Sequence, residues 1–138
     1  MTAIAVAPGL YWVGAVDWNV RNFHGFLTPR GTTYNAYLVV DSKIALIDTV
    51  MGPFCREMLD RIRQVVDPAK IDYVVANHAE MDHSGCLPQV MEIARNATLI
   101  TSQRFGEQSL EATFHAGWQF KPVKDGDTIS LGKRTLKF

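Results

Sequence analysis

The pattern of apolar and polar positions predicts short strands in the first third of the chain. Segments 10–16, 34–40 and 43–48 are rich in aromatic and β-branched residues, which favour strands. Asp41 and Ser42 separate the last two segments and suit a hairpin turn. We therefore predict three strands here, with a hairpin between the second and the third.

Helical periodicity begins shortly after these strands. Between residues 53 and 66, apolar side chains recur every three or four positions, which is typical of an amphipathic helix. Pro53 suits the first helical position, and Pro68 lies just beyond the end. A second helix is predicted from apolar residues that share one face: Leu87, Val90, Met91 and Ala94.

The remaining segments complete a mixed α/β pattern. Residues 71–77 form a short, continuous apolar run, which is typical of a strand buried on both faces. Residues 97–101 are predicted to form a strand and residues 103–115 a weaker helix, followed by short strands with turns at 125–126 and 132–133. No linker, repeat or low-complexity tract divides the chain, so we predict one domain over residues 1–138.

Charge and composition exclude several classes of partner. The 14 basic and 14 acidic side chains cancel, so the chain lacks the electrostatic footprint that nucleic acid or an anionic membrane surface requires. No apolar run reaches the roughly 18 residues of a membrane span. The apolar opening has no basic residue before Arg21 and is interrupted by Pro8 and Gly9. It is predicted to be a strand rather than a signal peptide, and the protein is predicted to be cytoplasmic.

The two cysteines, Cys55 and Cys86, are ordinary for a reducing compartment. A disulfide between them is possible but is not expected. Cys86 is interpreted as a small buried hydrophobe rather than a metal ligand. His115 ends a weak helix, where a partly charged imidazole suits the helix dipole, and we assign it no function.

The most informative stretch is VVANHAEMDHSGC, residues 74–86. It places His78, Glu80, Asp82 and His83 within six consecutive positions, on the loop between a buried strand and a helix. Such loops bind ligands in open α/β sheets, and clustered histidine and carboxylate side chains are typical of transition-metal sites. The plain alternative is a polar loop whose carboxylates cap the following helix. In an extended loop the alternate residues His78, Glu80 and Asp82 can face one way while His83 turns with the chain, so the four donors can converge. With four donors so close together, metal binding is favoured, and two neighbouring metals could share them.

The letters HAEMDH match H-x-E-x-D-H, the form that the metallo-β-lactamase superfamily motif takes in flavodiiron proteins, also called A-type flavoproteins. Hydrolases of that superfamily usually carry a second His at the position of Glu80, and they bind zinc. Three further stretches resemble the amino-terminal half of a flavodiiron core: GLYWVGAVDWNVRNFHG, GTTYNAYLVVDSKIALIDTV and DGDTISLGKRTLKF. The resemblance covers essentially the whole chain.

The resemblance implies a metallo-β-lactamase-like αββα sandwich with a site for two iron ions. By this resemblance His78 and Glu80 would bind one iron, and Asp82 and His83 would bind the other. Hard, anionic oxygen donors such as the Glu80 carboxylate stabilise ferric iron, which supports iron independently, although donor softness alone does not exclude zinc.

Two more residues acquire roles from the resemblance. Asp48 resembles the aspartate that braces the metal loop, a role that orients the ligands; a turn-capping aspartate is the alternative. His24 matches a position where some family members place a histidine near the iron pair. It is our catalytic candidate, because it could bind weakly or donate a hydrogen bond to a substrate oxygen; a surface-loop histidine is the alternative.

Flavodiiron proteins reduce dioxygen to water or nitric oxide to nitrous oxide. Their electrons come through FMN on a flavodoxin-like domain, from donors such as rubredoxin-like or flavin proteins, and their head-to-tail dimers bring that flavin close to the iron pair. The resemblance therefore implies an oxidoreductase, a small-molecule substrate and a homo-oligomer.

The chain departs from the family pattern in two respects. No stretch resembles the phosphate-binding loop of a flavodoxin-like domain, so FMN is not expected to bind this chain alone. Further family ligands would lie beyond Phe138, so we interpret the chain as the amino-terminal half of the core and expect it to be inactive alone. We also expect four apolar residues to need a partner surface: Ile129, Leu131, Leu136 and Phe138. Two alternatives remain, a zinc-dependent hydrolase and a non-catalytic remnant.

Overall fold

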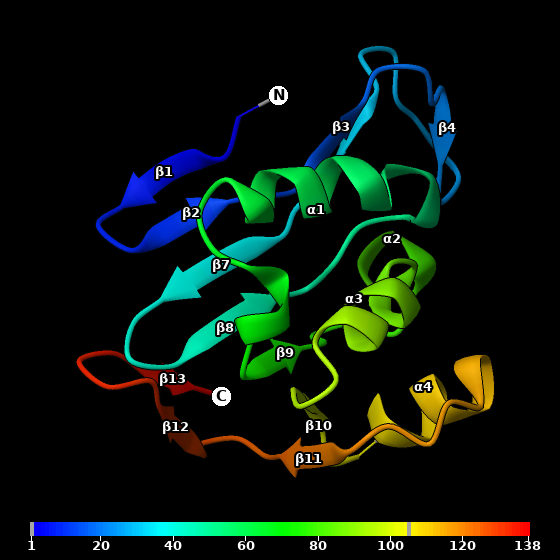
Figure 1. The fold of residues 1–138 in the computed structure, drawn as a ribbon. Helices are drawn as coiled ribbons and strands as arrows, with labels where there is room; N and C mark the ends of the chain where they lie inside the picture. The colour runs from blue at the N-terminus through cyan, green and yellow to red at the C-terminus, as the bar shows by residue number, and fades with distance from the viewer. Residues whose placement is uncertain (1, 105) are drawn as a thin grey trace.

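The computed structural model describes residues 2–104 and 106–138, and its centre is a seven-stranded mixed sheet (Figure 1). From edge to edge the strands are β1 (Ile4–Ala7), β2 (Leu10–Trp12), β7 (Tyr37–Val40), β8 (Ile44–Ile47), β9 (Tyr73–Val75), β10 (Thr98–Ser102) and β11 (Phe120–Val123). The pairs from β1 to β8 are antiparallel, and the pairs from β8 to β11 are parallel.

Three two-stranded pairs lie beside the main sheet. They are β3 (Ala15–Asp17) with β6 (Thr32–Tyr34), β4 (Asn22–Phe23) with β5 (Phe26–Leu27), and β12 (Thr128–Ser130) with β13 (Thr135–Lys137). The α-helices are α1 (Cys55–Arg63), α2 (Met81–Ser84), α3 (Leu87–Ile93) and α4 (Gly106–Phe114), and the 3-10 helices are η1 (Gly52–Phe54) and η2 (Pro68–Lys70). The mixed α/β fold predicted from the sequence is confirmed.

The two faces of the sheet bury different residues, because side chains alternate along each strand. The face covered by helices holds Leu38, Leu46, Val74 and Leu99, and the opposite face holds Val39, Ala45, Val75 and Ile100. Helices α1 and α3 complete the first face with Met58, Ile62, Leu87 and Val90. β9 is therefore buried on both faces, as its continuous apolar run predicts.

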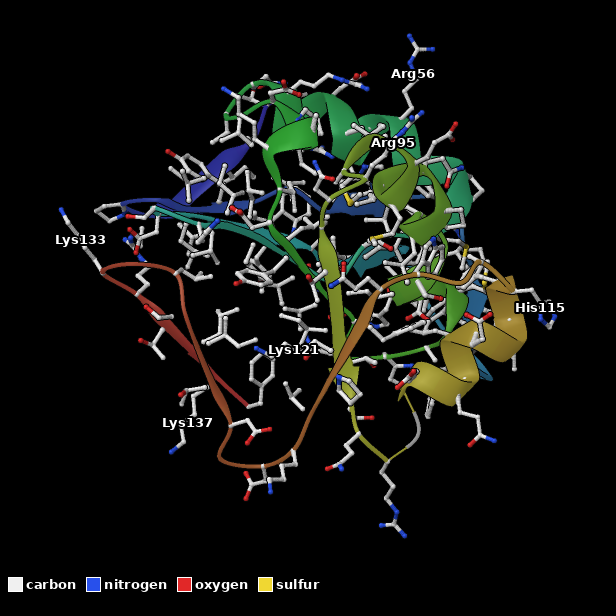
Figure 2. The ribbon with its side chains drawn as sticks, turned by 60° about the horizontal axis from the view of Figure 1, so that its bottom comes forward. Arg56, Arg95, His115, Lys121, Lys133 and Lys137 are labelled. Atoms are coloured by element: carbon white, nitrogen blue, oxygen red, sulfur yellow. A yellow bond between two sulfur atoms is a disulfide. The ribbon has the colours of Figure 1, made fainter. Side chains whose placement is uncertain are left out.

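The opposite face is covered by the β12–β13 hairpin of the same chain (Figure 2). Ile129 and Leu131 are buried there, and Leu136 and Phe138 pack against them while partly exposed. The expectation that these residues need a partner surface is wrong for the first two, because the hairpin folds back beneath β8 to β10. Lys43 N donates to Leu131 O at 2.8 Å and fixes the hairpin beside the sheet.

Some predicted strands are interrupted by tight backbone contacts. The segment 10–16 divides into β2 and β3, and 34–40 divides into β6 and β7. At Gly14 an added Cβ would lie 2.1 Å from Tyr34 O, so the two chain segments cross where only glycine fits. The crossing carries β3 and β6 away from the main sheet, and the β4–β5 hairpin extends from them.

The two cysteines are bonded to each other, which contradicts the expectation from the sequence. Cys55 is the first residue of α1, and Cys86 is the residue before α3. Their Cα atoms lie 5.2 Å apart, within the range that a disulfide requires. The physical reason is a close backbone contact between Gly52 and Gly85, which brings the two segments together.

Within the described part of the chain, every helix is too short or too polar to cross a bilayer.

Candidate metal centre

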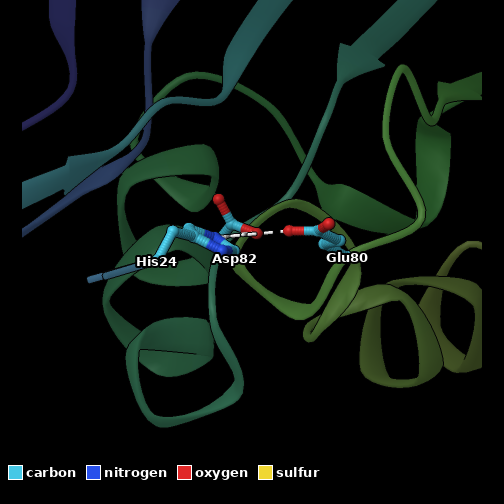
Figure 3. Close-up of side chains that lie close together, drawn as sticks. All are labelled: His24, Glu80 and Asp82. Carbon is cyan, nitrogen blue, oxygen red and sulfur yellow. Dashed lines mark ion pairs between the residues drawn. The ribbon is translucent and has the colours of Figure 1, made fainter. Parts of the chain in front are cut away.

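The residues of the H-x-E-x-D-H motif lie where the chain leaves β9 at the carboxyl end of the parallel strands. The β4–β5 hairpin approaches this segment from the amino-terminal part of the chain, so that His24 points toward Glu80 and Asp82 (Figure 3). The site therefore draws on two segments that are distant in sequence.

The motif is not the extended loop that the sequence suggested. Asp82 and His83 lie within the short helix α2, and Glu80 is the extended residue just before it. Ser84 Oγ donates to the backbone oxygens of Ala79 and Glu80, at 2.8 and 3.0 Å, and so supports this turn. The expectation that His78, Glu80 and Asp82 alternate along one extended face is wrong, because the chain turns into a helix at Met81.

A tight hairpin turn presents His24. His24 and Gly25 occupy the two central positions with φ of 50° and 81°, as a type I′ turn requires. Phe23 packs edge-on against the His24 ring, with ring centroids 4.2 Å apart, and lies 6.1 Å from the Tyr34 ring. The imidazole thus packs against the partly buried Phe23, which in turn lies beside the buried Tyr34.

Tyr34 anchors the base of this hairpin. It is buried and its hydroxyl donates to Asp17 Oδ2 at 3.0 Å. Burial, the hydrogen bond to Asp17 and the nearby Asp82 carboxylate raise the pKa of Tyr34 to about 12. The hydroxyl therefore stays protonated and keeps donating at neutral pH.

Three candidate ligand atoms converge between the hairpin and the motif. His24 Nε2 lies 3.3 Å from Glu80 Oε2 and 4.0 Å from Asp82 Oδ1, and one ligand atom from each residue lies within 4.8 Å of the others. The side chains of His24 and Glu80 are 50% and 55% exposed, whereas that of Asp82 is 13% exposed. Asp82 is thus the fixed member of the group, and the other two can adjust to an ion.

The two motif histidines lie beside this group without belonging to it. His83 Nε2 lies 3.1 Å from Asp82 Oδ2, and the His78 and His83 rings are 5.5 Å apart. His78 Nδ1 accepts a hydrogen bond from Glu80 N at 3.1 Å, which leaves its Nε2 available. The structure thus places the four motif donors close together.

Asp48 connects the strand β8 to the motif. Its Oδ1 accepts from Asn77 N at 2.8 Å, its Oδ2 accepts from Asn77 Nδ2 at 3.1 Å, and Oδ2 lies 3.5 Å from His83 Nδ1. The backbone φ of Asp48 is 57°, a region that aspartate tolerates better than most residues. Thr49 donates to His83 O from both its N and its Oγ1, at 2.9 and 2.7 Å.

Asn77 and Thr49 were not singled out from the sequence. Each is adjacent in sequence to a residue that was, Asn77 to His78 and Thr49 to Asp48. Their hydrogen bonds depend on β8 and β9 being parallel neighbours, so only the strand pairing identifies them.

The residues present fit a transition metal. Imidazole and carboxylate donors are the usual ligands of iron and zinc. His83 Nδ1 is buried and has no hydrogen-bond partner in the described structure, with the Asp48 carboxylate 3.5 Å away. A metal on His83 Nε2 would favour protonated Nδ1, which faces that carboxylate, and this is a common arrangement around bound metals.

Substitution of Asp48 by Asn is expected to weaken metal binding by about 10- to 100-fold. Asparagine tolerates the φ of 57° and its oxygen can still accept from Asn77 N, so the fold should persist. The charge that faces His83 Nδ1 is lost. Anaerobic titration with Fe²⁺ measures the affinity, and thermal unfolding of the metal-free protein provides the control. An unchanged affinity would show that Asp48 only caps the turn.

A family model described as "ODP family beta lactamase" matches residues 32–138 of the chain. The chain is 51% identical to a nitric oxide reductase of Moorella thermoacetica, over 98% of this chain and 34% of that protein. It is 48% identical to a rubredoxin-oxygen oxidoreductase of Megalodesulfovibrio gigas, over 100% of this chain and 35% of that protein.

Solved structures give the same result. The structure of rubredoxin oxygen:oxidoreductase from Desulfovibrio gigas matches with a TM-score of 0.93 and 47% identity, over 99% of this chain and 34% of that one. The flavodiiron protein from Giardia intestinalis matches with a TM-score of 0.92 and 39% identity, with the same coverage. The chain thus spans about a third of the length of these relatives. It belongs to the ODP family of β-lactamase-like domains, and it corresponds to the amino-terminal part of the metallo-β-lactamase-like domain of flavodiiron proteins.

Proposed function

We propose that the chain forms part of a diiron oxidoreductase that reduces dioxygen to water, nitric oxide to nitrous oxide, or both. The observation that carries the proposal is the convergence of His24, Glu80 and Asp82 within 4.8 Å, on a motif with glutamate where zinc hydrolases of the superfamily usually have histidine. The activities for which two relatives are named, nitric oxide reductase and rubredoxin-oxygen oxidoreductase, support it.

The four motif residues are the proposed iron ligands. His78 and Glu80 are assigned to one iron, and Asp82 and His83 to the other. A ferrous pair held by these residues would supply electrons for reduction of the substrate. The protein holds the donors in place through Asp48, whose carboxylate orients the His83 ring and accepts two hydrogen bonds from Asn77. Carboxylate donors also offset the positive charge of the ions.

His24 is proposed to act on the substrate side of the metal pair. Its imidazole is half exposed and reaches Glu80 and Asp82 from the opposite hairpin, so an N–H from its ring can be donated to a molecule that enters between them. The type I′ turn fixes its position without a long loop.

Substitution of His24 by Ala is expected to leave most of the iron bound and to lower turnover. The motif keeps its four donors in this variant, and only the hydrogen-bond donor opposite them is removed. Iron content per chain and the rate of oxygen or nitric oxide consumption are measured on the same preparation. Complete loss of iron would make His24 a primary ligand instead.

The electron supply and the assembly of the complete protein are proposals as well. The relatives are named for rubredoxin and for flavin, so we propose a rubredoxin-type donor, FMN outside residues 1–138, and a head-to-tail dimer. The cytoplasmic location and the extent of the domain stay predictions.

The test is an anaerobic purification of the complete gene product that includes this chain. Metal analysis should give about two irons per chain, and oxygen and nitric oxide electrodes should record consumption with an artificial reductant. Stoichiometric zinc together with ester or amide hydrolysis would replace the proposal with the hydrolase alternative. Absence of stoichiometric metal would favour the non-catalytic remnant.

A further inference from the structure

The Cys55–Cys86 disulfide lies directly beside the candidate metal centre. Cys86 follows the motif after only two intervening residues, and Cys55 begins α1 on the segment that leads from Asp48. The disulfide therefore links two segments covalently, residues 48–55 and residues 77–86, which together hold the motif.

We propose that Cys55 and Cys86 form a redox modification site that sets how firmly residues 77–86 hold metal. In the oxidised state the bridge keeps the two segments together, and a dithiol reductant loosens them. The inference rests on the metal site of the proposed function, but it depends neither on which metal binds nor on the reaction catalysed.

The coupling follows a continuous set of contacts between the two segments. Asp48 accepts from Asn77, and Thr49 donates to His83 O. Cys86 N donates to Thr49 Oγ1 at 3.4 Å, so the hydroxyl that contacts the motif also contacts the bridge. The disulfide is the one covalent bond among these contacts. The others are hydrogen bonds, which break when the two segments separate and form again when the segments close.

Burial of the two cysteines makes reduction of the disulfide depend on separation of the two segments. Cys55 is 5% exposed and Cys86 is fully buried, so a reductant reaches the sulfur atoms only after the segments move apart. A metal held by the motif opposes that movement, because its ligands lie on one of the two segments and are braced by the other. By linkage, the factor by which the bridge strengthens metal binding equals the factor by which metal disfavours reduction of the bridge.

A dithiol is the reductant that opens the disulfide. Reduction breaks the bond between the two sulfur atoms and adds two electrons and two protons, which gives two thiols. A dithiol supplies both and becomes a disulfide itself through thiolate attack on one sulfur atom. In the experiment a water-soluble phosphine replaces it, and is converted to the phosphine oxide with the oxygen of water.

The first measurement identifies the state of the cysteines. The protein is purified without reductant and alkylated, and the peptides that contain Cys55 and Cys86 are analysed by mass spectrometry before and after phosphine treatment. We expect a linked pair before treatment and two alkylated thiols afterwards, and slower reduction when Fe²⁺ or Zn²⁺ is bound. Two free thiols in the untreated protein would overturn the proposal.

The second measurement compares metal affinities. After anaerobic removal of the phosphine, Fe²⁺ and Zn²⁺ are titrated into the oxidised and reduced proteins, and the reduced form is expected to bind about tenfold more weakly. The double variant Cys55→Ala/Cys86→Ala should bind like the reduced form and should not respond to phosphine. Equal affinities in the two redox states would overturn the inference. Because both metals are titrated and no turnover is measured, failure of the oxidoreductase proposal would not be mistaken for failure of this one.

Discussion

Substitution of Asp82 by Ala should abolish tight metal binding while the chain stays folded. Both oxygens of this carboxylate face imidazoles, with Oδ1 4.0 Å from His24 Nε2 and Oδ2 3.1 Å from His83 Nε2. Asp82 is also the best buried of the three converging donors, so no other side chain can replace it without movement of α2. Loss of a direct ligand should exceed the roughly 10- to 100-fold cost of losing a bracing residue.

Anaerobic titration with Fe²⁺ and metal analysis after gel filtration measure this loss. Asp125→Ala is the matched control, because it removes an exposed carboxylate from the turn before β12, outside the motif. Asp82→Asn separates charge from shape, and it should also bind metal weakly because an amide oxygen is a poorer donor than a carboxylate. Retention of two irons per chain in Asp82→Ala would refute the ligand assignment.

The elements of the core were predictable because their burial is periodic. The apolar positions of the segment 53–66 mark the buried face of α1, and the continuous run at 71–77 corresponds to β9, which is covered on both sides. The periodicity of apolar residues does not reveal where two backbone segments cross. The division of segment 10–16 at Gly14 depends on Tyr34 O, and no local pattern reports that contact.

The candidate site was predictable to the extent that it is contiguous. The amino-acid sequence alone shows four donors within six positions. Their geometry, however, is set by the helical turn at Met81 and by the hydrogen bonds of Ser84. His24 became a candidate only through the family resemblance. Its approach to Glu80 depends on a hairpin that branches from β3 and β6, far from the motif in sequence.

The disulfide was missed for a related reason. From the cysteine count a disulfide was possible but not expected, since two cysteines in a chain of this length are ordinary for a reducing compartment. The sequence separation of 31 residues gives no indication of proximity. Proximity results from Gly52 and Gly85, which lack side chains where the segments meet.

Substitution of Gly85 by Ala should therefore destabilise the protein strongly. A Cβ at this position would lie 2.6 Å from Gly52 N and 3.2 Å from Met51 Cα, and these are backbone atoms that cannot rotate away. Overpacking of this kind costs on the order of 2–3 kcal/mol and should lower Tm by roughly 5–10 °C. Thermal and urea unfolding of the metal-free, oxidised protein measure the change.

Gly52→Ala is the control that separates this clash from a general intolerance of side chains in the region. Gly52 lies on the other side of the same contact, but its Cβ would meet only Gly85 O at 3.6 Å, an ordinary van der Waals distance. Neither glycine has a positive φ, so both substitutions test packing rather than backbone conformation. We expect Gly52→Ala to change the free energy of unfolding by less than about 1 kcal/mol. Equal effects of the two substitutions would mean that the segments can separate without cost, and the contact would then no longer explain why Cys55 and Cys86 lie close enough to bond.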